Sequence, residues 1–199
     1  MADMSLREAL KSRRTMRAFG DRAVPRDVLD RLLWAAQGMT DAAQNRTAPS
    51  AHALHPLRLF VSVGNVDGMG AGLYQVDRDS SDLGLARSGD MRPKLQAAAL
   101  EDQPWIGAAS LVVTICADLV AATTHFASQP PYGERGLRYA YIEAGAAAQN
   151  LMLQATADGL GTVLVAGFKD EATSDVLGLT APLAPVLHIC VGWGLSGAA

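Results

Sequence analysis

The chain has 199 residues, 49% of them hydrophobic, and carries a formal net charge of −3 at pH 7. This length and hydrophobic content are sufficient for one domain with a substantial core, which we expect to span residues 1–199. The sequence pI of about 5.8 argues against a general nucleic-acid-binding protein, which would carry a broad basic face.

Targeting signals and membrane-spanning segments are not recognisable in the sequence. Charged side chains occur among the first eleven residues, and no window approaches eighteen uninterrupted apolar residues. Cys116 and Cys190 lie within apolar runs and are expected to be small buried side chains in a reducing compartment. We therefore expect a cytoplasmic protein without membrane or nucleic-acid partners.

Two helices are expected near the start of the chain. Residues 4–13 contain Ser5 as a possible N-cap and Glu8 three residues later, which is the spacing of a capping box. Residues 24–40 have a proline near their start and a stripe of apolar side chains, and Gly38 is a candidate stop.

The remaining elements follow from apolar runs and turn residues. Polar and small residues with two prolines predict a loop at residues 41–56. Strands are predicted at 57–64, twice within the hairpin 71–89, and at 108–118, 160–167 and 183–192; helices are predicted at 90–100 and 137–159. Residues 122–136 are expected to form a loop or mobile lid. Because the hairpin interrupts a strict alternation of strands and helices, the sequence favours an α+β fold over a doubly wound sheet.

The helix expected at residues 137–159 is the longest in the chain. It is apolar on nearly every face, which predicts burial, and its alanines and Gly145 would let a second helix approach closely. One chain of this length would not cover such a helix easily. We therefore expect it to form the centre of an extensive, mainly apolar dimer interface.

Basic residues are concentrated in the segment KSRRTMRAFG, residues 11–20, although the whole chain is acidic. Arg13 and Arg17 are four residues apart, so they share a helix face or its continuation into a loop, and Thr15 adds a hydroxyl group. Guanidinium groups bind phosphate oxygens through paired donors. The alternative is a solvated basic helix end that complements the helix dipole, and for the cluster alone this is the simpler interpretation.

A second candidate site follows the strand expected at residues 160–167. Gly167 would let the backbone approach a planar ligand closely, although a turn glycine is the alternative. Glu143, within the long apolar helix, is expected to be a hydrogen-bonding carboxylate rather than a catalytic one. His52 and His55 lack nearby carboxylate or cysteine partners, which argues against a metal site.

Several motifs occur in a characteristic order along the chain: RRTMRAF, RTAPSAHALHP, DQPWIGAASLVV and YIEAGAAAQNLMLQATADGLGTVLVAGF. This order and spacing resemble the nitroreductase family of flavin enzymes, from about Leu6 to Gly192. Within the family, the RTAPSAHALHP loop, the GLYQVD hairpin and the EAGAAAQNL helix are most similar to the branch that contains the SagB-type azoline dehydrogenases of peptide tailoring. The resemblance implies an α+β nitroreductase-like fold, with a central, mainly antiparallel sheet flanked by helices. It also implies an entwined homodimer with two FMN sites at the subunit interface.

The resemblance also implies which residues contact the flavin. Its phosphate and ribityl chain would be held by Arg13, Arg14, Thr15 and Arg17. The other contacts would be Pro49, Ser50 and Ala51 covering the flavin from the partner subunit, Gln103 at the pyrimidine edge, and the backbone of Leu164, Val165, Ala166 and Gly167. Ala166 and Gly167 would approach the reactive N5 atom and are therefore expected catalytic positions. Arg138 and Tyr139 match a basic–tyrosine pair that looks catalytic in the azoline dehydrogenase branch.

The implied activity is a two-step reaction in which NAD(P)H reduces FMN and a small electron-poor acceptor, such as a nitroaromatic or a quinone, then takes the electrons. The alternatives are an azoline dehydrogenase, which would run the flavin in the opposite direction, and a flavin-binding dimer without turnover. Two departures from the family pattern stand out. The chain has no Lys or Arg after Lys169, where many members complete the phosphate site. Leu164 and Ala166 lie in a segment where relatives often carry Pro or Glu, which predicts a different choice of substrate.

Overall fold

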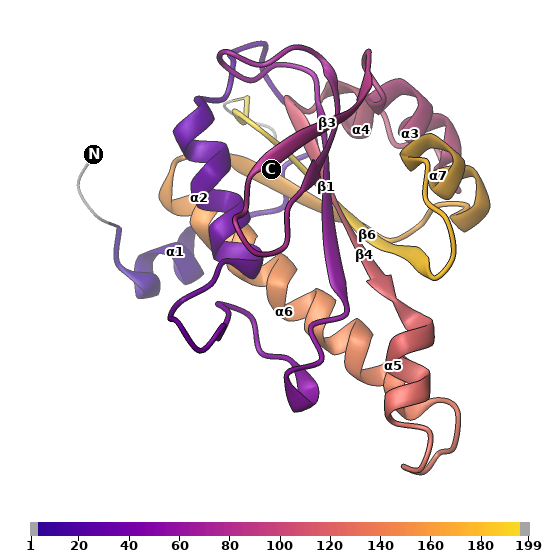
Figure 1. The fold of residues 1–199 in the computed structure, drawn as a ribbon. Coiled ribbons are helices and arrows are strands. Elements are labelled where there is room, and N and C mark those ends of the chain that lie inside the picture. Colours follow the sequence, from indigo (N-terminus) through magenta and orange to yellow (C-terminus); the bar gives the residue numbers. More distant parts are fainter. Residues whose placement is uncertain (1–3, 196–199) are drawn as a thin grey trace.

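The computed structural model describes residues 4–195 and contains one six-stranded sheet (Figure 1). The strands are β1 (Leu57–Val63), β2 (Gly72–Val76), β3 (Leu83–Ser88), β4 (Leu111–Asp118), β5 (Gly161–Val165) and β6 (Leu183–Gly192). They lie in the order β3-β2-β1-β4-β6-β5, and every neighbouring pair is antiparallel. The predicted α+β class and the antiparallel sheet are therefore confirmed.

Helices cover both faces of this sheet. In chain order they are α1 (Leu6–Ser12), α2 (Arg26–Gln37), the 3₁₀ helix η1 (Ala51–Ala53), α3 (Arg92–Ala98), α4 (Trp105–Ala108), α5 (Leu119–His125), α6 (Arg135–Ala157) and α7 (Asp170–Leu177). Helices α2 and α6 pack on one face, while α3, α4 and α7 pack on the other (Figure 1). Within residues 4–195, no helix is both long enough and apolar enough to cross a bilayer.

Strand β4 lies in the middle of the sheet and is buried on both sides. Val113 and Ile115 contribute to the core under α2 and α6, and Val112 and Cys116 contribute to the core under α3, α4 and α7. Successive side chains of a strand point to opposite faces. Double-sided burial therefore explains why this strand is a continuous apolar run rather than an alternating one.

Several predicted elements are confirmed and others need correction. The capping box of α1 is present, with the Ser5 hydroxyl and the Glu8 carboxylate each bonded to the other residue's backbone N–H. Residues 122–136 are not wholly a loop, because α5 extends to His125 and starts from an Asp118 cap whose carboxylate accepts a hydrogen bond from the N–H of Ala121 at 2.7 Å. Helices α4 and α7 are additional to the prediction, and β5 ends at Val165, before Ala166 and Gly167.

The long helix α6 is buried along one face rather than on every face. Alanines and Leu151 of this face pack into the core, as expected. On the opposite face, however, Tyr141 and Ile142 are 51% and 61% exposed, and a Cβ atom added to Gly145 would meet no atom within 4 Å. The chain by itself therefore leaves an apolar helical surface uncovered.

Candidate functional site

The basic segment after α1 runs along the outer edge of the sheet. Helix α1 ends at Ser12, and Thr15 forms a parallel bridge with Thr162 of β5, the edge strand. The backbone N–H of Met16 donates to the carbonyl oxygen of Thr162 at 2.8 Å. Residues 13–17 are therefore an extended continuation of the helix, and their side chains flank β5.

Arg17 meets an aromatic ring at this edge. Its guanidinium carbon lies 5.3 Å from the centroid of the Trp105 ring, at the start of α4. Arg17 is exposed, so its charge is available to a ligand. The indole N–H of Trp105 is buried without a hydrogen-bond partner among residues 4–195, which is unusual for a polar group inside a protein.

Gln103 and Gly167 lie in direct contact beside this pair. The Gln103 amide nitrogen donates to the carbonyl oxygen of Gly167 at 3.1 Å. Strand alternation buries Val165 and leaves Leu164 and Ala166 exposed. A Cβ atom at Gly167 would come no closer than 3.6 Å to another atom, so packing within the chain does not itself require glycine there.

A buried histidine supports the backbone next to Gly167. The ring of Phe168 lies 4.4 Å from that of His188, which also forms a 2.9 Å hydrogen bond with the hydroxyl of Thr114. Complete burial lowers the pKa of His188 to about 3, so the imidazole is neutral at physiological pH. These contacts fix the chain where it turns away from β5.

Arg14 differs from Arg17 in its contacts. Its guanidinium group donates to the carbonyl oxygens of Lys11 and Arg13, both at 2.8 Å. These bonds satisfy carbonyl oxygens at the C-terminal end of α1, which is a common role of a basic side chain at a helix end. Arg17 and the half-buried Arg13 have no such bonds in the described part of the chain.

A second group of predicted site residues lies on α6 and on the loop beside it. The N–H of Ala51 donates to the Glu143 carboxylate at 2.7 Å, and the Ser50 hydroxyl accepts from the N–H of His55 at 2.8 Å. Burial raises the pKa of Glu143, an effect opposed by the hydrogen bond from the Ala51 N–H and by the nearby Ser50 hydroxyl. Glu143 is thus the hydrogen-bonding carboxylate that the sequence predicts, and it holds the loop that contains Pro49.

Tyr139 belongs to this second group. Its hydroxyl donates to the Gln129 side chain at 3.1 Å, and its ring lies 4.7 Å from that of Phe126, which in turn lies 5.0 Å from the ring of His52. Arg138, by contrast, is exposed on α6. The aromatic cluster around Phe126 was not predicted, because residues 122–136 were expected to form a loop.

The two groups lie at different ends of the molecule. Figure 1 places the loop of residues 41–56 beside the N-terminal half of α6 and α5, whereas α3, α4 and α7 lie at the opposite end. Within one chain, the loop of residues 41–56 therefore lies apart from α4. The sequence analysis did not name Trp105, although the motif DQPWI contains it two residues after the predicted Gln103.

Comparisons with known proteins agree with this architecture. The nitroreductase family profile matches residues 10–193. A protein of Methanocaldococcus jannaschii whose name assigns it to the nitroreductases is 34% identical over 175 residues, which cover 88% of this chain and 85% of that protein.

Solved structures of similar fold also include proteins named as nitroreductases. One from Ralstonia eutropha, also named as a nitroreductase, is 26% identical with a TM-score of 0.80, covering 98% of this chain and 86% of its own. A structure from Staphylococcus epidermidis, named as an NAD(P)H:FMN oxidoreductase, has 19% identity and a TM-score of 0.70, covering 100% of this chain and 92% of its own. From its sequence and its fold, the chain belongs to the nitroreductase family.

Proposed function

We propose that the protein is an FMN-dependent oxidoreductase, which uses NAD(P)H to reduce small electron-poor molecules and works as a homodimer. Membership of the nitroreductase family supports an oxidoreductase, and the Staphylococcus epidermidis neighbour is named for NAD(P)H and FMN. The observation that carries the proposal is the convergence of Arg17, Trp105, Gln103 and Gly167 at the edge of β5.

These residues fit the chemistry of FMN. Arg13 and Arg17 provide guanidinium donors and Thr15 a hydroxyl, which suit a phosphate group. The amide of Gln103 can bond to the polar edge of a flavin ring. The unpartnered indole N–H of Trp105 is a further buried donor at the same edge.

The segment after β5 fits the ring itself. Leu164 and Ala166 present apolar side chains outward, and Gly167 leaves room for a planar group against its backbone. Neither outward side chain is charged, so we propose that they admit flat apolar acceptors without selecting them by ion pairing. When bound, FMN would accept a hydride from NAD(P)H and pass electrons to an acceptor such as a nitroaromatic or a quinone.

A second copy of the chain would complete this site. Glu143 ties Ala51, and with it the loop that contains Pro49 and Ser50, to α6, and Figure 1 shows this loop and α4 at different ends of the molecule. We propose that the exposed face of α6 pairs with its counterpart and brings this loop over the flavin of the other subunit. There it would exclude water from the reacting ring.

Titration with FMN tests the proposal. The purified protein should bind one flavin per chain, and Arg17→Gln should weaken binding by about ten- to a hundredfold, since a charge-assisted hydrogen bond contributes about 1.5–3 kcal/mol. Arg26→Gln is the matched control, because Arg26 is an exposed arginine on α2 whose ion pair within residues 4–195 is with Asp30.

Two results would contradict the proposal. One is a protein whose unfolding temperature does not respond to FMN, since a ligand that binds only the native state must stabilise it. The other is equal FMN affinity of the Arg17 and Arg26 variants, which would mean that the basic segment is a solvated helix end.

A further inference from the structure

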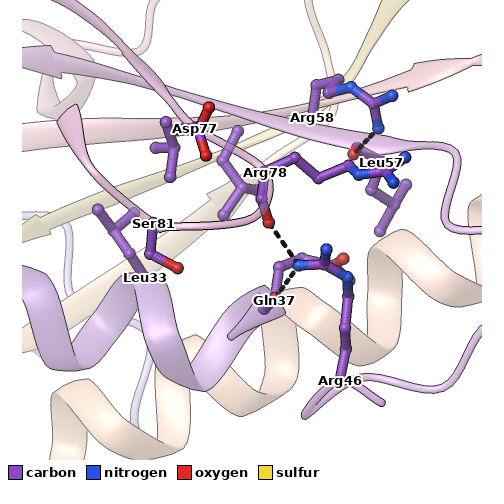
Figure 2. A pocket seen from close by; sticks show the side chains of 10 residues that line it. Leu33, Gln37, Arg46, Leu57, Arg58, Asp77, Arg78 and Ser81 are labelled. Atoms are coloured by element: carbon purple, nitrogen blue, oxygen red, sulfur yellow. Dashed lines mark hydrogen bonds between the residues drawn. The ribbon is translucent and has the colours of Figure 1, made fainter. Parts of the chain in front are cut away.

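A small cleft between α2, β1 and the turn of the β2–β3 hairpin is lined by three arginines from separate segments (Figure 2). Arg46 comes from the loop before η1, Arg58 from β1, and Arg78 from the hairpin turn. Figure 2 shows their guanidinium groups along one side of the cleft, with Leu33 and Leu57 contributing apolar wall. None of these residues belongs to the site proposed for FMN.

Arg46 is almost completely buried, with 2% of its side chain exposed. One guanidinium nitrogen donates to the carbonyl oxygens of Gln37 at 2.8 Å and Arg78 at 2.7 Å, and another contacts Asp79 at 3.2 Å. Its Nε atom is buried and has no partner among residues 4–195. A buried charge normally has its donors satisfied and its charge paired, so this nitrogen indicates a missing acceptor.

Positive charge exceeds negative charge around the cleft. Asp79 is the carboxylate that pairs with both Arg46 and Arg78, and it is 62% exposed. Arg58 donates to the carbonyl oxygens of His55 and Leu57, and it forms no ion pair within the described residues. Asp77, which also lines the cleft, uses its carboxylate on the backbone of the hairpin turn.

Burial and the excess of positive charge lower the pKa values of Arg58 and His55. Burial lowers the pKa of Arg58, and the charge of Arg78 lowers it further; Asp118 opposes both effects. The pKa of His55 is also lowered, mainly by burial and to a smaller extent by the charges of Arg46 and Arg78. Both groups therefore experience a positive potential that an anion in the cleft would relieve.

The dimensions of the cleft limit what can enter. The cleft is narrow, so only a single small group could enter it. Guanidinium groups recognise carboxylates and phosphates through paired hydrogen bonds in a way that a spherical halide cannot match. We propose that Arg46, Arg58 and Arg78 form a binding site for a small oxyanion, either a phosphate or the carboxylate of an organic acid.

The site lies behind the loop that contains Ser50. Arg46 stands at the start of this loop, and Arg58 holds the carbonyl of His55, whose N–H donates to the Ser50 hydroxyl. An oxyanion that ties Arg46 to Arg58 would thus stabilise both ends of the loop. The consequence for flavin binding rests on the function proposed above, whereas the oxyanion site itself does not.

Thermal unfolding of the full-length protein with excess FMN tests the site. Sodium phosphate, sodium acetate and sodium chloride are compared at matched ionic strength. We expect a saturable rise in the unfolding temperature with phosphate, acetate or both, and not with chloride. The anion that gives the larger rise in unfolding temperature, phosphate or acetate, shows whether the site prefers a phosphate or a carboxylate.

Variants locate the effect. Arg58→Gln and Arg78→Gln should each raise the half-saturating oxyanion concentration at least about tenfold, because each removes a charged donor. Arg17→Gln should leave the half-saturating oxyanion concentration unchanged while weakening FMN binding, because Arg17 is not one of the residues that line the cleft. The proposal is wrong if chloride stabilises as well as the oxyanions, or if both cleft variants respond like the unmodified protein. Failure of FMN binding would appear in the flavin absorbance and leave the oxyanion shift measurable.

Discussion

Glu143 lies on the buried face of α6, yet its carboxylate is bonded to the main chain of a loop 92 residues earlier. Its second oxygen is buried without a partner among residues 4–195. This arrangement costs desolvation free energy, which is why the pKa of Glu143 is raised. The residue therefore serves to position Ser50 and Ala51 rather than to contribute charge.

Two substitutions at Glu143 separate its role in positioning the loop from the effect of its charge. Glu143→Gln keeps an oxygen acceptor for the Ala51 N–H and should preserve the unfolding free energy at pH 7, whereas Glu143→Ala should lower it by about 1–3 kcal/mol by leaving that donor unsatisfied. Because the pKa of Glu143 is raised on folding, its contribution to stability is greatest below about 4.5 and declines as pH rises through the folded pKa. Urea unfolding across pH should show this decline in the parent protein and not in Glu143→Gln. Equal losses in both variants would contradict the positioning role.

His188 gives a pH dependence of the opposite sign. Burial lowers its pKa from 6.5 to about 3, so its contribution to stability is complete above about pH 6.5 and is lost as pH falls toward 3. The unfolding free energy should fall by up to about 1.4 kcal/mol per pH unit in this range. His188→Phe, which can still pack against Phe168, should show a shallower acid dependence in the same urea titrations. Identical slopes would show that other groups dominate acid unfolding.

The contrast between Arg14 and Arg17 shows what the sequence could not resolve. Both lie in one basic run, and the spacing alone allows a phosphate site or a helix end. In the structure Arg14 bonds to the end of α1, whereas Arg17 extends along β5 to Trp105. The difference depends on where α1 ends, and helix ends are set by backbone geometry that a residue pattern fixes only to within one or two residues.

The uncovered face of α6 is the element-scale feature with the clearest consequence. Tyr141 and Ile142 are exposed beside Gly145, where a second helix would have room to approach. An apolar surface of this kind is characteristic of an obligate interface.

A charge on this face should break the dimer. Ile142→Glu should convert the protein to a monomer in light scattering at micromolar concentration and reduce FMN binding, because the second half of the site would be lost. Leu85→Glu is the matched control: Leu85 is 56% exposed on β3, at the far edge of the sheet from the proposed FMN residues. A parent protein that is already monomeric would refute the proposed assembly.

Elements with strong periodicity or capping signals could be predicted from the sequence, and short amphipathic ones could not. The apolar runs of β1, β4 and β6 and the long pattern of α6 coincide with observed elements. Helix α4 has only four residues, and α7 lies between two strands without a side-chain cap, so neither gives a periodic signal of useful length. Helix α5 has an Asp118 cap, which is the signal that could have corrected the predicted lid.

On the scale of the whole molecule, the predicted site residues fall into two groups at different ends of the chain. Gln103, Gly167 and Arg17 lie near β5, whereas Ser50 and Ala51 lie at the start of η1, which a hydrogen bond from Ala51 to Glu143 links to α6. The order of motifs in the sequence, through the family resemblance, was enough to predict the residues of both groups. It could not show which of them meet within one chain, because that depends on how far the sheet separates α6 from α4.

The most direct test of the intersubunit FMN site is a mixed dimer. Arg17→Gln impairs the β5 half of the site, and Ala51→Trp fills the space next to the loop half; each variant alone should bind FMN poorly while retaining the parent unfolding profile. When the two are co-expressed and the mixed dimer is purified through different tags, one of its two sites has both changes and the other has none. We predict that FMN titration of this mixed dimer recovers one flavin per dimer at the parent affinity. No recovery would show that both halves of each site come from the same chain and would contradict the account.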